Sequence, residues 1–455
     1  MERFDVFVIG GGGTGSEVAF TLARSSDLSV AMAERHHLGG ECNLYGCLPT
    51  KVMLRSTRLL ALARDGARFG LRIPEVGIDF EAVQRRAREI VERRSGGGPS
   101  PFEELGVRVF LDEARLVGER RVELADGTQV EADRVVMATG SEPSIPPIPG
   151  LAEGPYWTNR EAIWDPMEPP RVLAVIGTGA IGAEFSQLYR RFGSEVTAIE
   201  VLPRILPHED EHAAASLASV FEAEGIRVLT GATIRSAEHG ADGWTLTIDG
   251  ASPISTDELL VAAGRRPVLD GHDLGGVGLQ LDEHGRPVLD DTLRTTAPDV
   301  WAAGDVTGDL LFTHVGNYEA DIVASDILGS PEPRDYRVVP RVTFTDPEVG
   351  SVGLTEEQAR NEGHDVVTAV VRTADNERSL IDGRPDGIVK LVADRDGTVL
   401  GGHIVADEAG AMIHEVVAIM AARATATAVA RAIHAYPTLS ESVKAALLGI
   451  DAQLG

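Results

Sequence analysis

The feature that most constrains the fold of this chain is a pattern of strand, glycine turn and helix that occurs twice. Apolar strands are predicted at 6–9 and at 172–176, and each leads directly into a G-x-G-x-x-G turn. The two turns have the same glycine spacing, with Gly10, Gly12 and Gly15 in the first and Gly177, Gly179 and Gly182 in the second. A helical stretch and another strand follow each turn, and that strand ends at Glu34 in the first copy and at Glu200 in the second. The pattern predicts two Rossmann-like α/β domains.

Each copy has all the parts of a dinucleotide-binding fingerprint. The glycines let a pyrophosphate approach the N-terminus of the helix, and the acid, 24 or 23 residues after the first glycine, hydrogen-bonds a ribose hydroxyl. A single G-x-G-x-x-G is weak evidence, but two copies that each lie between a strand and a helix predict two bound dinucleotides. Hydride transfer between them is the simplest reason for one chain to bind both.

The second acid indicates which nicotinamide nucleotide binds. The carboxylate of Glu200 would repel a 2′-phosphate, and the next basic residue along the chain is Arg204. NADH is therefore favoured over NADPH, with Arg204 as the residue that could alter this preference.

The chain has two cysteines, Cys42 and Cys47, and they lie five positions apart shortly after the first glycine turn. Two glycines precede them, which lets the backbone approach a flat or charged group, and Pro49 fixes the backbone after them. Two reduced cysteines in a core are the ordinary alternative. Their position beside a dinucleotide turn favours a redox-active dithiol next to a flavin.

Composition excludes several classes of partner. Lys plus Arg number 42 and Asp plus Glu number 70, so the net charge is −28. Nucleic acids and anionic membranes both require clustered positive charge, so we expect neither as a partner. Because there is no run of about 18 apolar residues, no signal-peptide pattern at 1–9 and too few cysteines for a disulfide scaffold, we expect a cytoplasmic protein whose disulfide is catalytic.

Proline-rich segments near 143–149 and 331–333 divide the chain. Beyond the second segment, alternating strands at 338–344, 366–371, 387–392 and 399–405 are followed by helical stretches at 408–423 and 439–449. This order predicts an antiparallel sheet with helices on one face, an α+β domain. The predicted boundaries are 1–150, 151–268, 269–335 and 336–455.

Taken together, the chain resembles the flavoprotein disulfide reductases with two dinucleotide-binding domains, the family of dihydrolipoamide dehydrogenase, glutathione reductase and mercuric reductase. Six segments carry the resemblance along essentially the whole chain: 39–51, 138–140, 263–267, 303–305, 344–348 and 434–441. It implies that the first glycine turn holds FAD together with Asp305, and that the second holds the nicotinamide nucleotide. In this family the four predicted parts, in chain order, would be the FAD-binding domain (first part), the NAD(P)-binding domain, the FAD-binding or central domain (second part) and the dimerisation domain. The resemblance also implies a homodimer in which the last domain completes the active site of the partner.

The resemblance implies specific roles for individual residues. Cys47 would be the flavin-proximal, charge-transfer thiolate and Cys42 the thiol that attacks a substrate disulfide. Lys51 would lie over the flavin and pair with Glu184. The implied cofactor-binding residues are Gly10, Gly12, Gly15, Glu34, Gly40, Lys51, Thr139, Gly140, Asp305, Thr313, His314, Gly177, Gly179, Gly182, Glu200 and Gly264.

The main departure from the family pattern lies near the C-terminus. Tyr436 stands where disulfide reductases carry a histidine before Pro-Thr, while the partner acid Glu441 is retained. A phenol with a pKa near ~10 is a poorer base at neutral pH than an imidazole near ~6.5. His434 could substitute only after a rearrangement, so we expect slow turnover of lipoamide and glutathione disulfides.

These observations favour an FAD-dependent, NADH-using oxidoreductase that acts on a disulfide or thiol-linked small molecule, in the manner of dihydrolipoamide dehydrogenase. Three alternatives stay open at this point. One is a mercuric reductase-like activity, although the second cysteine pair of those enzymes is absent. Another is a quinone reductase or transhydrogenase (diaphorase) activity, in which the cysteines are vestigial. The third is a structural flavoprotein subunit of a larger acyltransferase complex.

Overall fold

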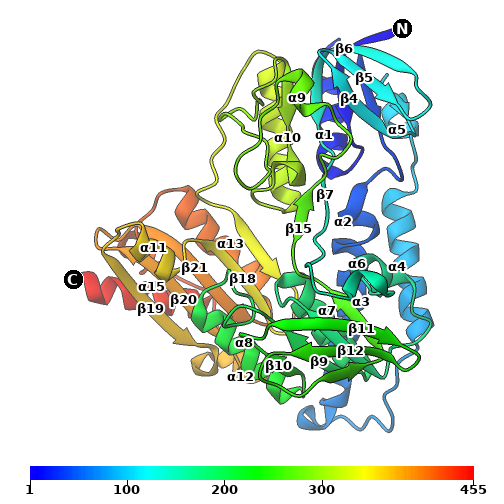
Figure 1. The fold of residues 1–455 in the computed structure, drawn as a ribbon. Helices are drawn as coiled ribbons and strands as arrows, with labels where there is room; N and C mark the ends of the chain where they lie inside the picture. The colour runs from blue at the N-terminus through cyan, green and yellow to red at the C-terminus, as the bar shows by residue number, and fades with distance from the viewer. Residues whose placement is uncertain (385) are drawn as a thin grey trace. The chain divides into compact units, whose positions relative to one another are not determined.

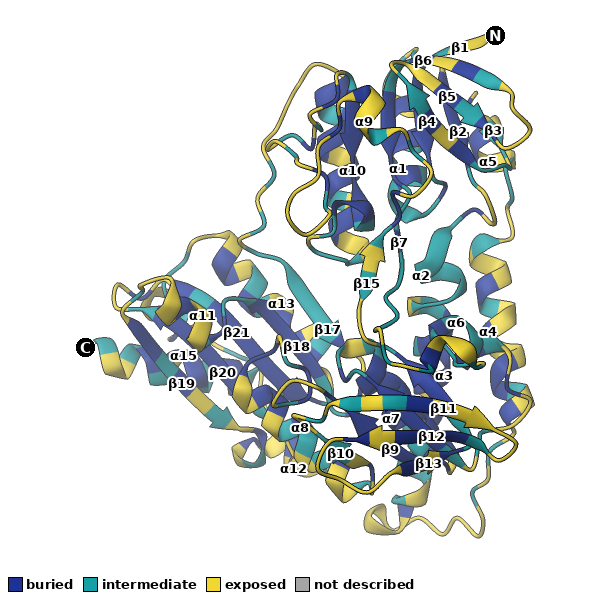
Figure 2. Cartoon of the chain, in the orientation of Figure 1, coloured by how far each residue is buried: buried dark blue, intermediate teal, exposed yellow. Residues whose placement is uncertain are grey.

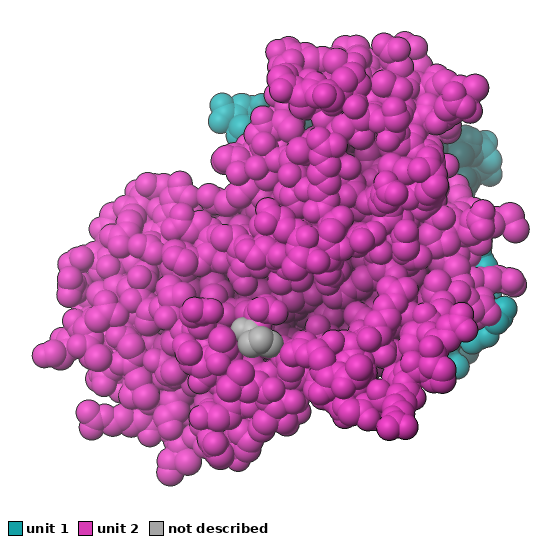
Figure 3. All heavy atoms as spheres, turned by 90° about the horizontal axis from the view of Figure 1, so that it is seen from below, with its two compact units in different colours: residues 1–50, 85–144, 265–335 teal, residues 51–84, 145–264, 336–455 magenta. Residues whose placement is uncertain are grey.

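The computed structural model describes residues 1–384 and 386–455. The chain forms two compact units, each built from three separate segments and each containing one of the two glycine turns (Figure 1). Unit 1 comprises residues 1–50, 85–144 and 265–335, and unit 2 comprises residues 51–84, 145–264 and 336–455 (Figure 3).

Unit 1 is built on a sheet with the strand order β3-β2-β1-β6-β5-β4, in which β16 also pairs with β6. Its parallel strands are β1 (Glu2–Ile9), β2 (Val30–Ala33), β3 (Arg108–Phe110), β6 (Gln129–Met137) and β16 (Val300–Ala302), and β4 (Ala114–Gly118) and β5 (Arg121–Leu124) form an antiparallel edge. The short strands β7 (Ser141–Pro143) and β15 (Arg265–Pro267) pair separately. The helices are α1 (Gly13–Ser25), α2 (Gly40–Leu44), α5 (Ser100–Glu103), α9 (Leu274–Val277) and α10 (Thr313–Ile327), with a 3₁₀ turn η3 (Gly304–Thr307).

The central strand β1 explains why the first turn lies where it does. Val6, Phe7 and Val8 are completely buried, so both faces of the strand are covered and it reads as a continuous apolar run (Figure 2). Helices α1 and α10 pack against each other along this unit. A ligand held by the glycine turn therefore lies at the carboxyl end of a buried parallel sheet, where open α/β sheets bind their ligands.

Unit 2 contains a parallel sheet, β10-β9-β8-β14, and a three-stranded antiparallel sheet, β11-β12-β13. The elements are η2 (Leu151–Glu153), α6 (Asn159–Trp164), β8 (Val172–Ile176), α7 (Ala180–Phe192), β9 (Glu195–Ile199), α8 (Glu211–Ala223), β10 (Arg227–Leu229), β11 (Ile234–Gly240), β12 (Gly243–Ile248), β13 (Ile254–Thr256) and β14 (Glu258–Val261). Helix α3 (Cys47–Arg64) enters this unit from its fifth residue and is followed by η1 (Gly66–Phe69), while α4 (Phe80–Ser95) leads back to unit 1.

The C-terminal part of unit 2 is a five-stranded antiparallel sheet, β17-β18-β21-β20-β19. Its elements are β17 (Pro340–Thr343), β18 (Glu348–Gly353), α11 (Glu356–Asn361), β19 (Val366–Arg372), η4 (Thr373–Asp375), α12 (Glu377–Ile381), β20 (Ile388–Asp394), β21 (Val399–Ala406), α13 (Ala409–Ala421), α14 (Ala426–Val429) and α15 (Glu441–Leu454). Apolar residues of the sheet, α13 and α15 form one buried core. The predicted fold class, two Rossmann-like parts and an α+β part, is confirmed.

Two features differ from the sequence-based expectation. Strand β18 was not predicted, because Gly350 and Gly353 are poor strand formers. A Cβ on Gly350 would lie 2.7 Å from the carbonyl oxygen of Ala409, so this glycine lets α13 approach the strand. The antiparallel sheet β11-β12-β13 was also not predicted, since its strands are short and half exposed. Within the described residues, no helix has the length and apolar character needed to cross a bilayer.

Candidate redox and dinucleotide-binding sites

The first glycine turn requires glycine at two positions. Gly10 has a φ of +108°, and a Cβ there would lie 2.2 Å from the carbonyl oxygen of Ala138. A Cβ on Gly15 would lie 1.9 Å from the carbonyl oxygen of Gly10. The turn and the close packing of α1 on β1 therefore depend on these missing side chains.

The N-terminus of α1 is open to an anion. Gly12 is the N-cap residue, no side chain caps the helix, and its first turn carries no acid. Glu34 stands at the end of β2, where its Oε2 accepts a hydrogen bond from Gly11 N at 2.8 Å and its Oε1 accepts one from His36 N at 2.9 Å. Backbone donors fix this carboxylate and leave lone pairs for a hydroxyl, so the residues fit a dinucleotide.

The second glycine turn has the same construction. Gly177 has a φ of +89°, and a Cβ there would lie 2.5 Å from the carbonyl oxygen of Ala262. A Cβ on Gly182 would lie 1.9 Å from the carbonyl oxygen of Gly177. Gly179 is the N-cap residue of α7, again without a capping side chain or an acid in the first turn. This helix N-terminus also fits a pyrophosphate.

Glu200, at the end of β9, is buried and held by three donors. Its Oε2 accepts hydrogen bonds from Thr178 N at 2.9 Å and from Thr178 Oγ1 at 3.0 Å, and its Oε1 accepts one from Leu202 N at 3.0 Å. Arg204 lies on the following loop, with its Nη2 3.4 Å from the carbonyl oxygen of Pro207 and 3.6 Å from Glu357 Oε2. Both contacts are long, and the Arg204 Nε has no hydrogen-bond partner among the described residues.

The two cysteines are joined by a disulfide and packed against the first turn. Cys42 lies in α2, Cys47 begins α3, and their Cα atoms are 4.7 Å apart. Gly40 has a φ of +66°, and a Cβ on it would lie 2.7 Å from the Cα of Gly12. The sulfur of Cys47 lies 3.8 Å from Thr313 Oγ1, at the start of α10. The disulfide therefore lies between the first glycine turn and the start of α10.

Other predicted FAD residues also come together in unit 1. A Cβ on Gly304 would lie 2.5 Å from Thr14 Oγ1, so the turn that bears Asp305 packs on α1. Ser141 Oγ donates to Asp305 Oδ2 at 2.6 Å, directly after the positive-φ residue Gly140. Thr139 Oγ1 donates to the carbonyl oxygen of Val268 at 2.6 Å, which makes it a structural contact here. His314 stacks on Phe312, with ring centroids 5.4 Å apart.

Lys51 lies four residues after Cys47 on α3 and forms a buried ion pair. Its Nζ donates to Glu184 Oε2 at 2.7 Å, and the Glu184 side chain is 4 % exposed. Glu184 Oε1 accepts a hydrogen bond from Phe344 N at 2.9 Å, and the Lys51 Nζ lies 4.8 Å from the centroid of the Phe344 ring. The pair joins α3, α7 and β17 within unit 2.

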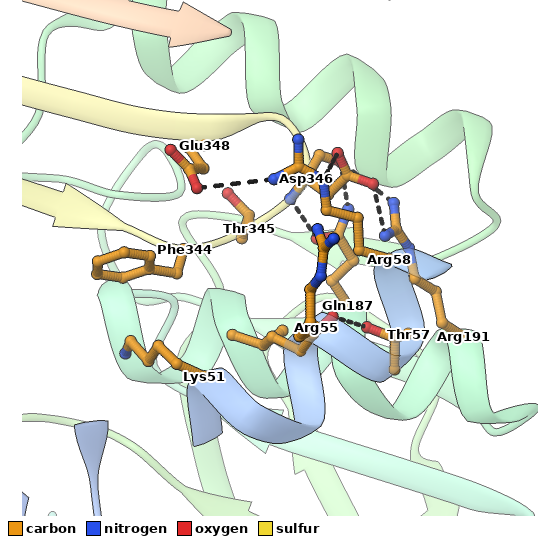
Figure 4. Close-up of a pocket in the computed structure, with 11 residues that line it drawn as sticks. Lys51, Arg55, Thr57, Arg58, Gln187, Arg191, Phe344, Thr345, Asp346 and Glu348 are labelled. Atoms are coloured by element: carbon orange, nitrogen blue, oxygen red, sulfur yellow. Dashed lines mark hydrogen bonds and ion pairs between the residues drawn. The ribbon is translucent and has the colours of Figure 1, made fainter. Parts of the chain in front are cut away.

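A cavity of about 100 Å³ lies beside this ion pair (Figure 4). Its lining comes from α3, α7 and the segment after β17, namely Lys51, Leu54, Arg55, Thr57, Arg58, Gln187, Arg191, Phe344, Thr345, Asp346 and Glu348. Burial raises the pKa of Glu348 to about 7, although Gly410 N and Arg58 oppose the shift. The volume suits a few water molecules rather than a nucleotide.

In the C-terminal segment Tyr436 is exposed to solvent, whereas His434 is mostly buried. The Tyr436 residue is 70 % exposed, whereas the His434 side chain is 12 % exposed. The two ring nitrogens of His434 face oxygens, Nε2 at 2.8 Å from Glu415 Oε1 and Nδ1 at 3.1 Å from the carbonyl oxygen of Ala432. Burial lowers the pKa of His434, but the hydrogen bonds to Glu415 and to the Ala432 carbonyl, together with the charge of Glu415, raise the pKa overall.

The structure therefore gives His434 a partner that sequence reasoning missed. Glu415 lies on α13, 19 positions before His434, and nothing in the sequence links the two. Glu441 instead accepts a weak hydrogen bond at 3.3 Å from Thr438 N, just ahead of α15. The predicted cofactor-binding residue Gly264 follows β14 in unit 2 and has a φ of +113°.

Two glycine turns, each with an acid hydrogen-bonded to its backbone, and a disulfide packed on one of them are the features expected of an oxidoreductase that couples two dinucleotides to a dithiol. A model of the pyridine nucleotide-disulphide oxidoreductase family matches residues 4–323, and a model of the dimerisation domain of that family matches residues 339–447. The chain belongs to this family, which confirms the resemblance and the enzyme class drawn from the motifs. Its members are NAD(P)H-dependent flavoprotein disulfide oxidoreductases, so a flavin and a pyridine nucleotide are its cofactors.

Individual relatives cover the chain almost completely. Dihydrolipoyl dehydrogenase from Chlorobaculum tepidum is 36% identical, covering 98% of this chain and 96% of that protein. Mercuric reductase from Bacillus cereus is 33% identical, covering 98% of this chain and 72% of that protein. Among solved structures, the HOCl-induced flavoprotein disulfide reductase RclA from Escherichia coli is 26% identical with a TM-score of 0.87, covering 98% of this chain and 99% of that one. RclA has also been solved as a Cu(II) complex.

Proposed function

We propose that this protein is an FAD-dependent oxidoreductase that oxidises NADH and reduces a small-molecule disulfide through Cys42 and Cys47. The observation that carries the proposal is the Cys42–Cys47 disulfide, packed through Gly40 onto the first glycine turn. Overall, NADH, one proton and a disulfide give NAD⁺ and two thiols. Bound FAD supplies the two-electron redox chemistry between nucleotide and disulfide.

In this function the first turn, Gly40 and Asp305 bind FAD, and the second turn and Glu200 bind NADH. Residues 1–150 and 269–335 form the FAD-binding part, 151–268 the NADH-binding part and 336–455 the dimerisation part. The match to a dimerisation domain supports a homodimer. We propose that in this dimer the 434–441 segment faces the disulfide of the partner. Disulfides of cytosolic proteins are usually transient and catalytic, as proposed here for Cys42 and Cys47, so we place the protein in the cytoplasm.

The cysteines exchange with substrate by two successive attacks. The Cys42 thiolate attacks one sulfur of the substrate disulfide, which breaks that bond, forms a mixed disulfide and releases a thiolate that takes up a proton. The Cys47 thiolate then attacks the Cys42 sulfur, which breaks the mixed disulfide and restores the Cys42–Cys47 bond. The second substrate sulfur leaves as a thiolate and takes up a proton. The N-terminus of α3 favours the thiolate form of Cys47.

Lys51 and Glu184 act as an orienting pair. Because Glu184 is buried and accepts from both Lys51 and Phe344 N, the ammonium is held in one position on the helix that carries Cys47. A cation fixed at this position would stabilise negative charge on the flavin when it is bound. A neutral or mobile side chain at this position would not stabilise that negative charge.

The acid–base group of the disulfide half-reaction is the weak point of this site. Tyr436 is exposed and offers a phenol, while His434 already directs both of its nitrogens to Glu415 and Ala432. A leaving thiolate would therefore find no free imidazole on this segment. We infer that ordinary disulfides are slow substrates.

This same observation favours a second candidate function, reduction of an acceptor that needs no proton relay at the cysteines. A quinone, a second nicotinamide nucleotide or a soft metal ion such as Hg(II) would fit that description. The similarity to a mercuric reductase supports the metal ion, although residues Cys42 and Cys47 are the only cysteines of this chain.

The two functions are separated by NADH oxidation with a panel of acceptors, comprising lipoamide, glutathione disulfide, a quinone and Hg(II). Wild type is compared with Tyr436→His and, as the matched control, Tyr436→Phe. We expect Tyr436→His to raise lipoamide or glutathione reduction by at least about tenfold, because general acid–base catalysis is typically worth 10²–10⁴-fold. Quinone reduction should be unchanged in both variants. If wild type already reduces lipoamide at about 100 s⁻¹ and Tyr436→His lowers that rate, the tyrosine is itself the working group.

A further inference from the structure

The loop that follows Glu200 forms a wall of the second glycine turn. Residues 201–210 connect β9 to α8, and the loop folds back so that Leu206 N donates to the carbonyl oxygen of Thr178 at 2.9 Å. Thr178 lies inside the glycine turn and donates twice to Glu200. The position of this loop therefore bears directly on the turn and on its ribose-binding acid.

Leu206 has a backbone conformation that its neighbours must impose. It has a φ of +43°, a region that branched residues rarely occupy, and it is 3 % exposed. Such a conformation persists only where surrounding contacts over-determine it. Its carbonyl oxygen accepts a hydrogen bond from Glu209 N at 2.9 Å, so the end of the loop holds Leu206 in place.

The end of the loop is in turn held by the dimerisation domain. Arg341, on β17, grips the Glu209 carboxylate with two parallel bonds, Nε to Oε1 at 2.7 Å and Nη2 to Oε2 at 3.0 Å. Ser351 on β18 donates to Glu209 Oε2 at 2.6 Å. The three side chains come from two strands and a loop, and the Glu209 side chain is 11 % exposed.

A second ion pair holds the next residue. Lys390 on β20 is completely buried, and its Nζ lies 2.9 Å from Asp210 Oδ2 and 2.9 Å from Glu356 Oε2. Asp210 also caps α8 by accepting from His212 N at 3.0 Å. Together Glu209, Asp210, Arg341, Ser351 and Lys390 form what we call the loop clamp.

We infer that the dimerisation domain sets the affinity of the nicotinamide nucleotide site through the loop clamp, with Arg341 and Lys390 as positioning residues for Thr178 and Glu200. The inference rests on the proposed binding of NADH at the second glycine turn. Without Arg341, the buried Glu209 carboxylate would lose its ion pair and keep only the hydroxyl donor of Ser351. The loop end would then move towards water, and the bond from Leu206 to Thr178 would loosen. Thr178 and Glu200 touch the pyrophosphate and ribose side of a dinucleotide rather than its reacting ring. The clamp should therefore control binding and not the rate of hydride transfer.

The test uses the flavin-loaded full-length protein mixed with NADH in a stopped-flow instrument. The dependence of flavin reduction on NADH concentration gives an apparent Kd and a limiting rate. We expect Arg341→Met to raise the Kd about tenfold, the size typical of coupling through a packed network, with the limiting rate within about twofold. Arg341→Lys keeps the positive charge but loses the bidentate contact with Glu209, and it should raise the Kd for NADH only a few-fold. Arg235→Met, which removes an exposed ion pair with Asp249 in the same unit, is the matched control and should change neither number.

Several outcomes decide the inference. An unchanged Kd in Arg341→Met, or an equal loss in Arg235→Met, would overturn it while leaving the proposed function intact. A fall in limiting rate without a change in Kd would also overturn it. If Arg341→Met does not fold, Ser351→Ala, which removes only one hydroxyl donor, must still raise the Kd a few-fold. Wild-type protein that binds FAD but is not reduced by NADH would contradict the proposed function itself.

Discussion

The two glycine turns of this protein have nearly the same backbone geometry. The N-cap residues Gly12 and Gly179 have φ and ψ of −68° and −172° in the first turn and −63° and −173° in the second. Both turns leave the helix N-terminus uncapped by a side chain, and in both the acid at the end of the second strand accepts a hydrogen bond from the residue after the first glycine. The backbone device is therefore duplicated down to its hydrogen bonds.

What differs is the segment packed against each turn. The first turn lies against Gly40, at the start of the helix that carries Cys42, so it is coupled to the disulfide. The second lies against the loop that starts after Glu200 and is anchored by Arg341. In addition, Thr178 gives Glu200 a hydroxyl donor, whereas the corresponding residue in the first turn, Gly11, has no side chain. Turns of the same construction thus have different surroundings, which fits the different cofactors proposed for them.

The largest expected effect comes from removing the disulfide while both glycine turns stay intact. Cys42→Ser should lower disulfide reduction by at least about 10³-fold, because it removes the attacking nucleophile. NADH-to-quinone activity should stay within about twofold, since neither turn is touched. Steady-state rates with lipoamide and with a quinone on the same preparation check this. Equal loss of both activities would mean that the disulfide packing also sets the flavin site.

The next effect concerns the two acids. We expect wild type to prefer NADH over NADPH by about 10²-fold in reduction rate at low concentration, because Glu200 would face a phosphate dianion. Glu200→Gln should narrow this preference to about tenfold or less. Glu34→Gln, the matched change in the other turn, should leave the preference alone and reduce FAD retention. Stopped-flow rates that favour NADPH in wild type would reverse the assignment and direct attention to Arg204.

Smaller effects should follow from the third glycine of each turn. Gly182→Ala should raise the Kd for NADH at least about tenfold with full FAD content, because its Cβ would meet the carbonyl oxygen of Gly177 at 1.9 Å. Gly15→Ala has the same clash in the other turn and should instead lower the ratio of FAD to protein. Absorbance of the purified variants and NADH titrations measure both quantities. The opposite pattern would exchange the cofactors between the turns.

The smallest effect tests the one donor that distinguishes the turns. Thr178→Val keeps the shape of a buried side chain but removes the hydrogen bond from Oγ1 to Glu200. We expect NADH affinity to fall about fivefold, which corresponds to the roughly 1 kcal/mol net contribution of an ordinary hydrogen bond. Thr178→Ser retains the hydroxyl and should bind NADH nearly as wild type does. A loss as large in Thr178→Ser as in Thr178→Val would show that packing, not the hydroxyl, matters here.

The parts of this site that could be predicted from sequence are those whose chemistry lies within a short segment. The glycine turns, their acids and the Cys42–Cys47 spacing each fit within about 25 residues, where strand and helix periodicity decides the geometry. The departure at Tyr436 was visible for the same reason. Strand β18 escaped prediction because its two glycines serve close packing against other elements rather than strand propensity.

The sequence by itself determined that two dinucleotide turns, a redox-active disulfide and an antiparallel C-terminal sheet occur in this order, because each depends on local patterns of glycine, acid and apolar residues. Only the tertiary structure decided which side chains meet across that order. Arg341 is 132 positions from Glu209. The partner of His434 is likewise distant, since its Nε2 lies against Glu415 on α13 and not against a residue of the segment around Tyr436. Such contacts depend on how a sheet packs against loops and helices. Once packing has buried a carboxylate such as that of Glu209, leaving its charge without a partner is costly, so the contact with Arg341 is retained.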